Sequence, residues 1–528
     1  MINWRKVWPP VAILAGAIAL KAALLALDAV PFNADEAVVA LMARHILQGE
    51  RPWFFYGQAY MGSLDAYLVA GAFAVLGETV LAVRVVQVVL FAGVLLIGYG
   101  VALRITAARH TALVTALLLA FPPVLLTLYT TASLGGYGEA LLAGNLLLWW
   151  GHRLGWEEAQ RRRLWLAWGL VAGLGFWAFG LVLVYLAPVA LWLLWRLHTR
   201  PWRGYLLAAL GFGVGSLPWW LGNLSRVGVA VAELSGAAVR STATAGGLLS
   251  NIGARTFNFV ILGLPALFGL RFPWSVEGPP LWLAVPALAL YLGGLGYGLR
   301  RPHSHTPILQ NRLLLWGVCG ALFLGFILTP FGGDPSGRYF LPLYLPLFIF
   351  TADALTALRE RVGHWAWVLL GAVLAFNLVG TAQAAFTNPP GITTQFEAIT
   401  QVDHCYDAAL IRFLRAHDGT RGYSNYWVAY PIAFLSGEEI ILVPRLPYKA
   451  DLRYTSRDDR YAPYGEAVEA SPTVVYVTTN HPTLDELLRE QFRSLGVDFR
   501  EAQIGDYHIF YNLSRKVTPD EPLLQAEE

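Results

Sequence analysis

Three acidic side chains and one basic side chain of this sequence are of the types that carry group-transfer chemistry. Asp35, Asp65 and Glu139 are carboxylates, and Arg338 is a permanent, fork-shaped cation suited to phosphate. Carboxylates can deprotonate a hydroxyl or hold a divalent metal through oxygen ligands, and an arginine can stabilise a phosphate leaving group. Such chemistry requires that the surrounding elements bring these groups to one face of the protein.

The composition indicates which kind of element surrounds them. Of 528 residues, 56% are hydrophobic and only 14% are charged, whereas soluble chains carry about 25% charged residues. These values exclude a soluble globular protein and a disordered chain, and two cysteines exclude a disulfide scaffold. A net charge of +3 gives no reason to expect a nucleic-acid partner. The composition predicts an α-helical, polytopic membrane protein.

Uncharged stretches long enough to cross a bilayer, which takes about 20 helical residues, recur up to about residue 385. They predict about eleven transmembrane helices. Basic loops should stay in the cytoplasm, among them those holding Arg5 and Lys6, Arg104, and Arg359. All of them can lie on one side if residues 164–195 cross twice, as two short helices that turn near Gly180. We therefore expect a multi-pass plasma-membrane protein with a cytoplasmic N-terminus.

The tail has a different pattern, which separates a membrane domain, residues 1–385, from a soluble domain, residues 386–528. Charged residues return, and helix-like and strand-like segments alternate, which is typical of an α/β domain. We expect helices over 408–416 and 483–495 and strands over 439–443, 473–478 and 507–512. An odd number of spans places this domain outside the cell. Its run from Tyr448 to Tyr464, rich in charges and tyrosines, is most simply a solvated loop, with contact to a sugar or acceptor as the alternative.

The loop after the first span carries the pair Asp35-Glu36. One interpretation is structural: Asn33 caps a helix, and acids in its first turn interact favourably with the helix dipole. The functional interpretation is an acidic group at the membrane face. Downstream, Tyr56, Gln58 and Tyr60 belong to an aromatic and polar loop that would suit a ring-shaped polar ligand, although an aromatic belt at the membrane interface has a similar composition.

The other three charged groups fall on the same predicted external side. Asp65 follows the aromatic loop. Glu139 lies where the third span meets the fourth, at or within membrane depth, where ionisable groups are costly and usually functional; a solvated turn is the alternative. Arg338 opens a late span in Arg338-Tyr339-Phe340-Leu341-Pro342, where a pair with Asp334 or an interfacial arginine is the alternative.

These residues resemble a known family. Asp35-Glu36 after span one, Arg84 opening span two, Glu139, and the Arg338 segment are similar to motifs of GT-C type membrane glycosyltransferases of the family 39 class. That class includes the protein O-mannosyltransferases, the aminoarabinose transferases of lipid A and the RgtA/B/C/D-like group. The resemblance covers about residues 1–360. Where the family often has a His-Pro-Pro or Lys-Pro-Pro run, this chain has Gly62-Ser63-Leu64-Asp65.

The resemblance implies a GT-C fold and the inverting transfer of a sugar from a polyprenyl-phosphate donor to an envelope acceptor on the external face. Asp35 would be the base or would orient the acceptor, and Glu36, about 100° away around the helix, would brace the helix or contact the acceptor. Glu139 and Asp65 would contact a metal or the acceptor, and Arg338 would hold the lipid phosphate. Family members commonly use a divalent cation; without a His/Cys cluster, Mg²⁺, Mn²⁺ or Ca²⁺ is the choice, and no organic cofactor is expected.

Two other functions compete with this one. A carrier or flippase for a lipid-linked sugar would share the lipid-binding face, but it should place ionisable groups near mid-membrane and pair broken helices in its two halves. A non-catalytic envelope scaffold would tolerate replacement of the carboxylates in the loops. The clustering of acids on one predicted face favours the transferase.

Overall fold

The chain folds into two compact units. The computed structural model describes residues 4–198, 201–225, 228, 230, 233, 247–300, 306–386 and 391–519. The helical unit comprises Met1–Asp28, Ala59–Asp65 and Arg84–Ala385, and the mixed unit comprises Ala29–Gln58, Ala66–Val83 and Phe386–Glu528. Two segments near the start of the chain therefore belong to the same unit as the C-terminal tail.

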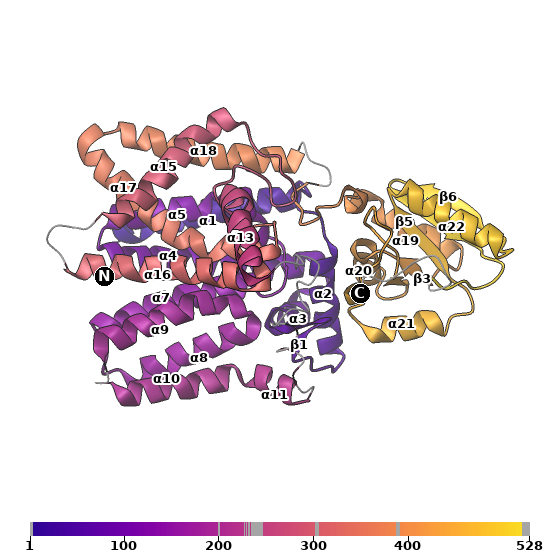
Figure 1. Ribbon diagram of the computed structural model, residues 1–528, viewed down its shortest axis with the longest axis horizontal. Helices are drawn as coiled ribbons and strands as arrows, with labels where there is room; N and C mark the ends of the chain where they lie inside the picture. The colour runs from indigo at the N-terminus through magenta and orange to yellow at the C-terminus, as the bar shows by residue number, and fades with distance from the viewer. Residues whose placement is uncertain are drawn as a thin grey trace. The chain divides into compact units, whose positions relative to one another are not determined.

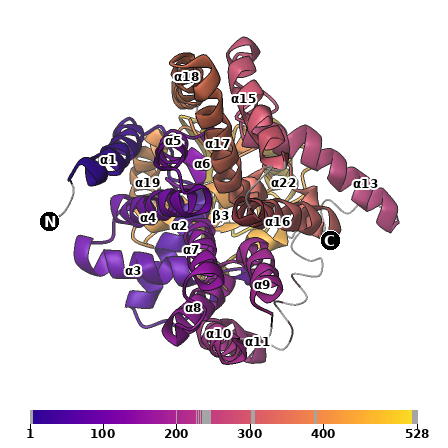
Figure 2. The ribbon, with the colours of Figure 1, turned by 90° about the vertical axis from the view of Figure 1, so that its left-hand side faces the viewer.

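The helical unit is built from long apolar helices and a few short turns (Figures 1 and 2). Its helices are α1 (Trp4–Ala26), α4 (Val80–Thr106), α5 (Arg109–Ala120), α6 (Val124–Tyr129), α7 (Tyr137–Trp156), α8 (Arg162–Ala178), α9 (Leu183–Leu197), α10 (Trp202–Gly215), α11 (Leu217–Ser225), α13 (Leu248–Asn258), α14 (Leu264–Leu267), α15 (Leu281–Leu299), α16 (Thr306–Leu328), α17 (Tyr344–Val362) and α18 (Trp365–Phe386). Short 3₁₀ turns η1 (Gly180–Val182), η4 (Pro330–Gly333) and η5 (Arg338–Leu343) and a π turn η3 (Phe259–Gly263) join some of them.

Within the described residues, seven helical segments are long and apolar enough to cross a membrane, or eight if the bent pair α10 and α11 is one span. Helices α5, α7 and α8 are shorter or more polar but pack in the same bundle, against α17, α8 and α10 respectively. As the sequence predicted, residues 164–195 form two helices that turn at Phe179. The third span expected from the sequence, which precedes Glu139, is not one continuous helix. Pro122 and Pro123 divide it into α5 and α6.

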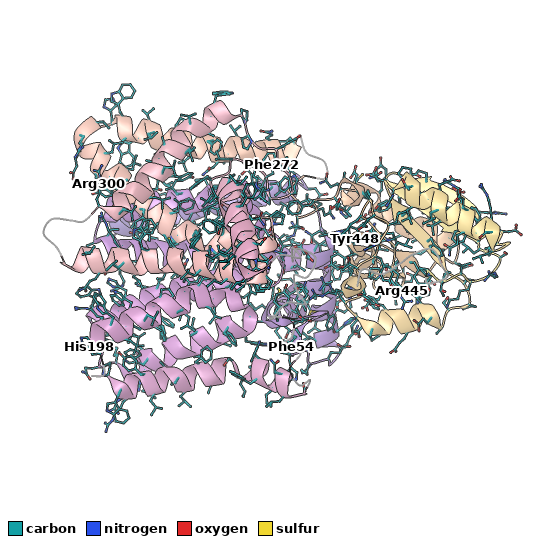
Figure 3. All side chains as sticks on the ribbon, viewed as in Figure 1. Phe54, His198, Phe272, Arg300, Arg445 and Tyr448 are labelled. Carbon is teal, nitrogen blue, oxygen red and sulfur yellow. The ribbon has the colours of Figure 1, made fainter. Side chains whose placement is uncertain are left out.

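The bundle has two distinguishable ends. Figure 3 labels His198 and Arg300, which cap the C-terminal ends of α9 and α15, at one end of the helical unit, and Phe272 toward the other. The Arg271 guanidinium donates to the Pro335 carbonyl, so the segment before Arg338 lies at the Phe272 end. Arg338 and the basic loop residue Arg300 are therefore at opposite ends of this unit.

Helices α8 and α10 pack backbone to backbone through glycines. A Cβ atom at Gly169 or Gly173 would lie 2.0 or 2.3 Å from a carbonyl oxygen of α10, and one at Gly211 or Gly215 would lie 2.4 Å from a carbonyl oxygen of α8. In both helices the glycines are four residues apart, the spacing that lets membrane helices approach closely. Any larger residue at these four positions would force the pair apart.

The mixed unit contains a five-stranded sheet with helices around it (Figure 1). Its elements are α2 (Ala34–Leu47), β1 (Phe54–Phe55), most of α3 (Leu64–Leu76), α19 (Asp407–Ala416), β3 (Arg421–Ser424), α20 (Tyr426–Leu435), β4 (Ile441–Pro444), α21 (Ala462–Glu469), β5 (Val475–Thr479), α22 (Pro482–Ser494), β6 (Arg500–Ile504) and β7 (Tyr507–Tyr511). Strand β2 (Gln58–Gly62) crosses the unit boundary. The strand order is β4-β3-β5-β7-β6, with β3 parallel to β4 and β5 and β7 antiparallel to β5 and β6.

All five elements that the sequence predicted in the tail are present to within a few residues, as α19, α22, β4, β5 and β7. The fully buried pattern of β4 and β5 matches their apolar, β-branched composition. Residues 387–390 and 520–528 of the predicted soluble domain lie outside the described residues.

Candidate functional site

Asp35 lies in the first turn of α2, in the mixed unit. Asn33 caps this helix, because its side-chain oxygen accepts a hydrogen bond from the backbone N–H of Glu36 at 3.1 Å. Glu36 is fully buried, whereas Asp35 is half-buried, as expected for neighbours that point in different directions around a helix. The capping interpretation thus explains how the helix begins, but it leaves the Asp35 carboxylate available for other contacts.

The C-terminal tail supplies the partner of that carboxylate. Tyr426, at the start of α20, donates a hydrogen bond from its hydroxyl to Asp35 Oδ1 at 2.6 Å. The Arg460 guanidinium lies over the Tyr426 ring, 5.2 Å from its centre. Burial, and then the negative charge of Asp35, raise the pKa of Tyr426, so its hydroxyl remains a donor. Sequence reasoning selected Asp35 but not Tyr426, and it considered Arg460 only as part of the run from Tyr448 to Tyr464.

Arg460 is held on several sides. With its amide oxygen turned toward the guanidinium, Gln58 accepts hydrogen bonds from Nη1 and Nη2 at 2.9 and 3.0 Å. The hydroxyl of Tyr430 accepts from the Arg460 backbone N–H at 2.6 Å. Asp458, two residues earlier, is buried, and this burial raises its pKa to about 6 despite the opposing charge of Arg460. The run from Tyr448 to Tyr464 is therefore solvated only in part: Asp451, Arg453 and Ser456 are exposed, whereas Asp458 is buried and Arg460 packs against Tyr426.

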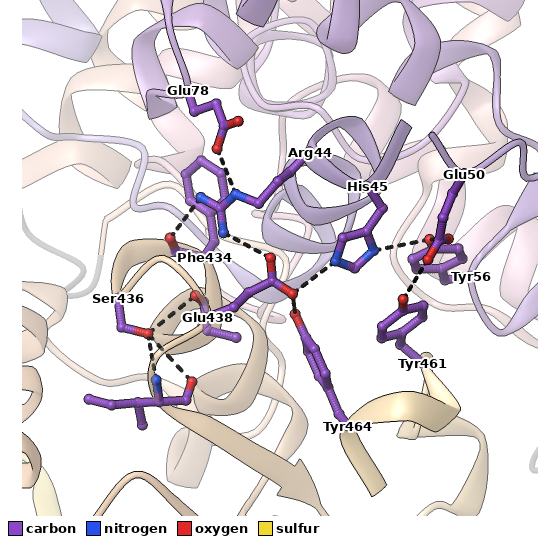
Figure 4. Close-up of polar contacts among 12 residues, drawn as sticks. Arg44, His45, Glu50, Tyr56, Glu78, Phe434, Ser436, Glu438, Tyr461 and Tyr464 are labelled. Carbon is purple, nitrogen blue, oxygen red and sulfur yellow. Dashed lines mark hydrogen bonds and ion pairs between the residues drawn. The ribbon is translucent and has the colours of Figure 1, made fainter. Parts of the chain in front are cut away.

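A second polar cluster forms where Arg44 and His45, near the end of α2, contact Glu438 of the tail (Figure 4). The Glu438 carboxylate accepts from His45 at 2.9 Å, from the Tyr464 hydroxyl at 2.7 Å and from Arg44 at 3.3 Å. Arg44 also pairs with Glu78 at 2.6 Å. Burial alone would raise the pKa of Glu438, but the hydrogen bonds from His45, Tyr464 and Arg44 outweigh it and lower the pKa to about 2. The backbone of Glu438 is left-handed, with φ 64°, which is unusual for a non-glycine residue.

Tyr56 joins this cluster from the predicted aromatic loop. Its hydroxyl donates to Glu50 at 2.5 Å, and its ring stacks on Tyr461 with ring centres 4.8 Å apart. Tyr461 also donates to Glu50, at 2.6 Å (Figure 4). Of the three residues predicted in that loop, Tyr56 and Gln58 contact the tail within the mixed unit, whereas Tyr60 belongs to the helical unit.

Asp65 and Glu139 lie together in the helical unit. Asp65 Oδ2 accepts from the Ser133 hydroxyl at 2.5 Å, and Oδ1 accepts from the side-chain amide of Gln87 at 3.1 Å. The left-handed Gly135-Gly136 turn before α7 supplies two more hydrogen bonds from its backbone N–H groups. Glu139, in the first turn of α7, has its carboxyl beside that of Asp65. Both are buried, at 2% and 5% exposure, so Glu139 is not in a solvated turn.

The two carboxyls differ in their surroundings. Asp65 is held by several donors, whereas neither oxygen of Glu139 makes a well-formed hydrogen bond among the residues described. No group of three or more His, Cys, Asp or Glu side chains in the described ranges could hold a metal ion. Arg84, also part of the family resemblance, is buried in α4 one turn before Gln87.

Arg338 lies at the start of η5 in the same unit. It pairs with Asp334 at 2.5 Å, so the local ion pair considered from the sequence is formed. Its guanidinium carbon is 5.2 Å from the centre of the Tyr339 ring, and Tyr137 and Tyr129 are also close enough to interact with its charge. The Arg338 Nε is buried without a hydrogen-bond partner in the described chain. Yet 36% of the Arg338 side-chain surface is accessible.

An apolar cavity of about 880 Å³ has Tyr339, the residue after Arg338, in its lining. Its lining comes from α8, η1, α9, α11, α16, η4 and η5, and includes Tyr60, Phe179, Gly320, Phe331 and Tyr339. Tyr60 packs against Phe179 and Phe331, with ring centres 6.5 and 6.0 Å apart. Tyr339 therefore links the cavity wall to Arg338, its neighbour in sequence. A long hydrocarbon with a charged end would match this combination of surfaces.

Comparison with solved structures identifies the fold of the chain. No protein-family model and no curated protein sequence matches the chain. Among solved structures, it is similar to ArnT from Cupriavidus metallidurans bound to undecaprenyl phosphate, with a TM-score of 0.58 and 13% identity over 94% of this chain and 98% of that one. The chain has the GT-C fold. ArnT in the apo state (TM-score 0.53, 15% identity, 94% and 98% covered) and the apo Archaeoglobus fulgidus oligosaccharyltransferase (0.51, 12%, 91% and 70%) are similar as well.

On this GT-C fold, the predicted site residues form separate groups. Asp65 lies with Glu139, and Arg338 lies with Asp334 beside the cavity that Tyr60 lines, all in the helical unit. Asp35, Glu36, Tyr56 and Gln58 lie in the mixed unit with tail residues. The contacts of Tyr426 and Glu438 were missed, since they join residues about 390 positions apart and no local pattern reveals them.

Proposed function

We propose that this GT-C chain is a membrane glycosyltransferase that moves a sugar from a polyprenyl-phosphate donor to a cell-envelope acceptor. The observation that supports it most is that Arg338 directly precedes Tyr339, which lines the apolar cavity in the helical unit. The cavity would take part of the polyprenyl chain, and the guanidinium would bind the phosphate with charge-assisted hydrogen bonds. The ArnT structure similar to this chain holds undecaprenyl phosphate, a ligand of this chemistry.

In the proposed reaction, Asp35 acts as the general base. The acceptor hydroxyl oxygen attacks the anomeric carbon and gives its proton to the Asp35 carboxylate. The bond from that carbon to the phosphate oxygen breaks, its electron pair stays on the phosphate, and polyprenyl phosphate leaves. Arg338 stabilises the charge that develops on the phosphate. A single displacement of this kind inverts the configuration at the anomeric carbon.

The remaining predicted residues take supporting roles in this proposal. Glu36, buried behind the helix cap, braces α2. Glu139, whose oxygens lack other good partners, contacts the acceptor, and Asp65 orients the turn before Glu139. Tyr56, Gln58 and Tyr60 form the substrate loop. Asp65 is occupied by its donors, so the pair offers fewer free oxygen ligands than Mg²⁺, Mn²⁺ or Ca²⁺ requires, and the steps above use no metal.

The multi-pass helical unit implies a membrane location. We propose the plasma membrane, with the N-terminus in the cytoplasm and both the C-terminal domain, residues 386–528, and the transfer reaction on the external side. The Arg300 end of the helical unit would then face the cytoplasm and the Arg338 end the exterior, in agreement with the retention of positive charge inside.

The test uses purified protein in lipid, a panel of radiolabelled polyprenyl-phosphate sugars and an envelope extract as acceptor. The native chain is compared with Asp35→Asn, which removes the charge but keeps the shape. We expect transfer by the native protein and a loss of about 10²- to 10⁴-fold in the variant, with donor binding retained. If the donor binds but no sugar moves, a carrier or scaffold is favoured. If Asp35→Asn transfers at the native rate, Asp35 is not the base.

A further inference from the structure

The C-terminal tail contacts Asp35, the general base of the proposed reaction. We propose that Tyr426 and Arg460 are positioning residues for Asp35, so that the C-terminal domain completes the reaction site. This inference rests on the proposed function, because it assigns the two residues a role only through Asp35. It gives the soluble tail a direct part in transfer.

Tyr426 fixes one oxygen of the carboxylate. Its hydroxyl donates to Oδ1 at 2.6 Å, and it is the only side chain in the described part of the protein that hydrogen-bonds Asp35. Tyr426 is 3% exposed, whereas Asp35 is half-buried. A carboxylate held at Oδ1 and open at its other side presents Oδ2 to an incoming hydroxyl. Fixing a base in this way lowers the cost of reaching the reactive geometry.

The start of α20 is itself well anchored. Asn425 caps the helix by accepting from the Trp427 backbone N–H at 3.0 Å, and its amide donates to Thr479 at the end of β5 at 2.8 Å. The Tyr426 hydroxyl is thus carried on a helix end that is fixed to the sheet. A rigid support is what a positioning residue needs.

Arg460 packs against the ring of Tyr426. Its guanidinium lies over the ring at 5.2 Å, and Gln58 and the Tyr430 hydroxyl fix its side chain and backbone. Among the described residues, the charged groups that interact with Asp35 include Arg460 and Asp458, both from the segment before α21. The positive charge of Arg460 and the negative charge of Asp458 act on Asp35 in opposite directions. Arg460 Nε is buried and has no hydrogen-bond partner in the residues described, so this N–H group is left over after the Nη bonds to Gln58.

A purely structural role is the competing explanation, in which Tyr426 only ties the tail to α2. The chain offers a matched control for this case. Tyr507, in β7, donates from its hydroxyl to the Asp407 carboxylate, also in the C-terminal domain, and Tyr507 is 1% exposed. Tyr507→Phe removes the same kind of buried hydrogen bond without involving Asp35.

The experiment measures kcat, donor KM and thermal midpoint for the native chain, Tyr426→Phe, Arg460→Met, Arg460→Lys and Tyr507→Phe, all full length in lipid. We expect Tyr426→Phe to lower kcat about 10- to 100-fold with donor KM unchanged, the effect of one hydrogen bond to a charged group. Arg460→Met should lower kcat about tenfold, and Arg460→Lys, which keeps the charge, should recover part of it. Tyr507→Phe should lower the thermal midpoint but not kcat.

The outcomes separate the two proposals. Native-like kcat in Tyr426→Phe, while Asp35→Asn is inactive, would overturn the positioning role and leave the base assignment intact. Equal losses of kcat in Tyr426→Phe and Tyr507→Phe would show that any weakened tail impairs transfer, which also overturns it. Normal transfer by Asp35→Asn would remove the base itself and both proposals with it.

Discussion

The two units of the chain place their charged groups in contrasting environments. In the helical unit, Arg338 pairs with Asp334 and lies near tyrosines, one of which, Tyr339, lines an apolar cavity. In the mixed unit, Asp35 and Glu438 accept hydrogen bonds from tyrosines of the tail, and arginines and a histidine complete the clusters. One unit offers a cation beside a hydrocarbon-like space, and the other offers carboxylates in a polar setting.

The contrast agrees with a division of labour between donor and acceptor. A polyprenyl phosphate needs an apolar surface and a cation, whereas a hydroxyl acceptor needs a fixed carboxylate. In this interpretation, each unit can be disabled separately and each loss has its own signature. Damage to the helical unit should appear in donor binding, and damage to the mixed unit should appear in the rate of transfer.

The largest effect within the helical unit is expected at Arg338. Arg338→Met should weaken donor binding about 100-fold, because a phosphate loses a charge-assisted partner and Asp334 loses its counter-charge. Arg338→Lys should lose less, since it keeps the charge but not the fork. Binding of a labelled polyprenyl phosphate to protein in lipid measures both. Unchanged affinity in Arg338→Met would show that the phosphate binds elsewhere.

Sequence reasoning predicted the elements far better than the contacts. Hydropathy predicted most of the bundle. The turn between two helices, expected near Gly180 and found at Phe179, followed from the positions of the basic loops, because one crossing would have placed an arginine cluster outside. The α/β pattern of the tail was equally readable, since β4, β5 and β7 are short apolar strands. Periodicity is a local property, and a single sequence contains it in full.

The partners of the candidate residues could not be predicted in the same way. The bond from Tyr426 to Asp35 joins distant segments, and the grouping of residues 29–58 with the tail depends on tertiary packing. The prediction for the run from Tyr448 to Tyr464 was wrong in part for this reason: its charges suggest solvent, but Asp458 and Tyr464 are 8% and 4% exposed. Its alternating tyrosines and arginines were the one local signal, because a merely solvated loop has little need for large aromatic rings.

The buried acids of the helical unit test whether the two carboxyls there differ in role. Asp65→Asn should lower stability by about 1–3 kcal/mol, because the new amide group cannot accept from every donor that now points at Asp65. Glu139→Gln, which orphans no donor, should leave the thermal midpoint near that of the native chain and reduce transfer instead. Thermal unfolding and transfer assays on both variants measure these effects. A loss of transfer in Asp65→Asn with a loss of stability in Glu139→Gln would show that Asp65 contacts the acceptor and Glu139 supports the fold.

A smaller effect is expected when the cavity is partly filled. Gly320 lines the cavity, and a Cβ atom there meets nothing within 4 Å, so Gly320→Leu should fit locally and occupy space in it. Transfer from a long-chain donor should fall by about tenfold, whereas a short-chain analogue should be little affected, since each displaced CH₂ of the chain loses about 0.8 kcal/mol of burial. Gly296→Leu, in α15 and equally open but outside this lining, is the matched control. If Gly320→Leu lowers transfer from both donors equally, the cavity does not bind the polyprenyl chain.

The smallest effect concerns the stability of the Glu438 cluster and its dependence on pH. The pKa of Glu438 is lowered to about 2 in the folded protein from an ordinary value of 4.5, so the cluster contributes stability above about pH 4.5 and loses it as the pH falls toward 2. Glu438→Gln should therefore lower the thermal midpoint by a few degrees at pH 7, and this difference should shrink between pH 4.5 and 3. Glu439→Gln, the exposed neighbour that pairs with Arg415, is the control and should show little change. If the difference between native and Glu438→Gln stays constant across that range, the contacts of Glu438 with His45 and Arg44 do not stabilise the mixed unit through charge.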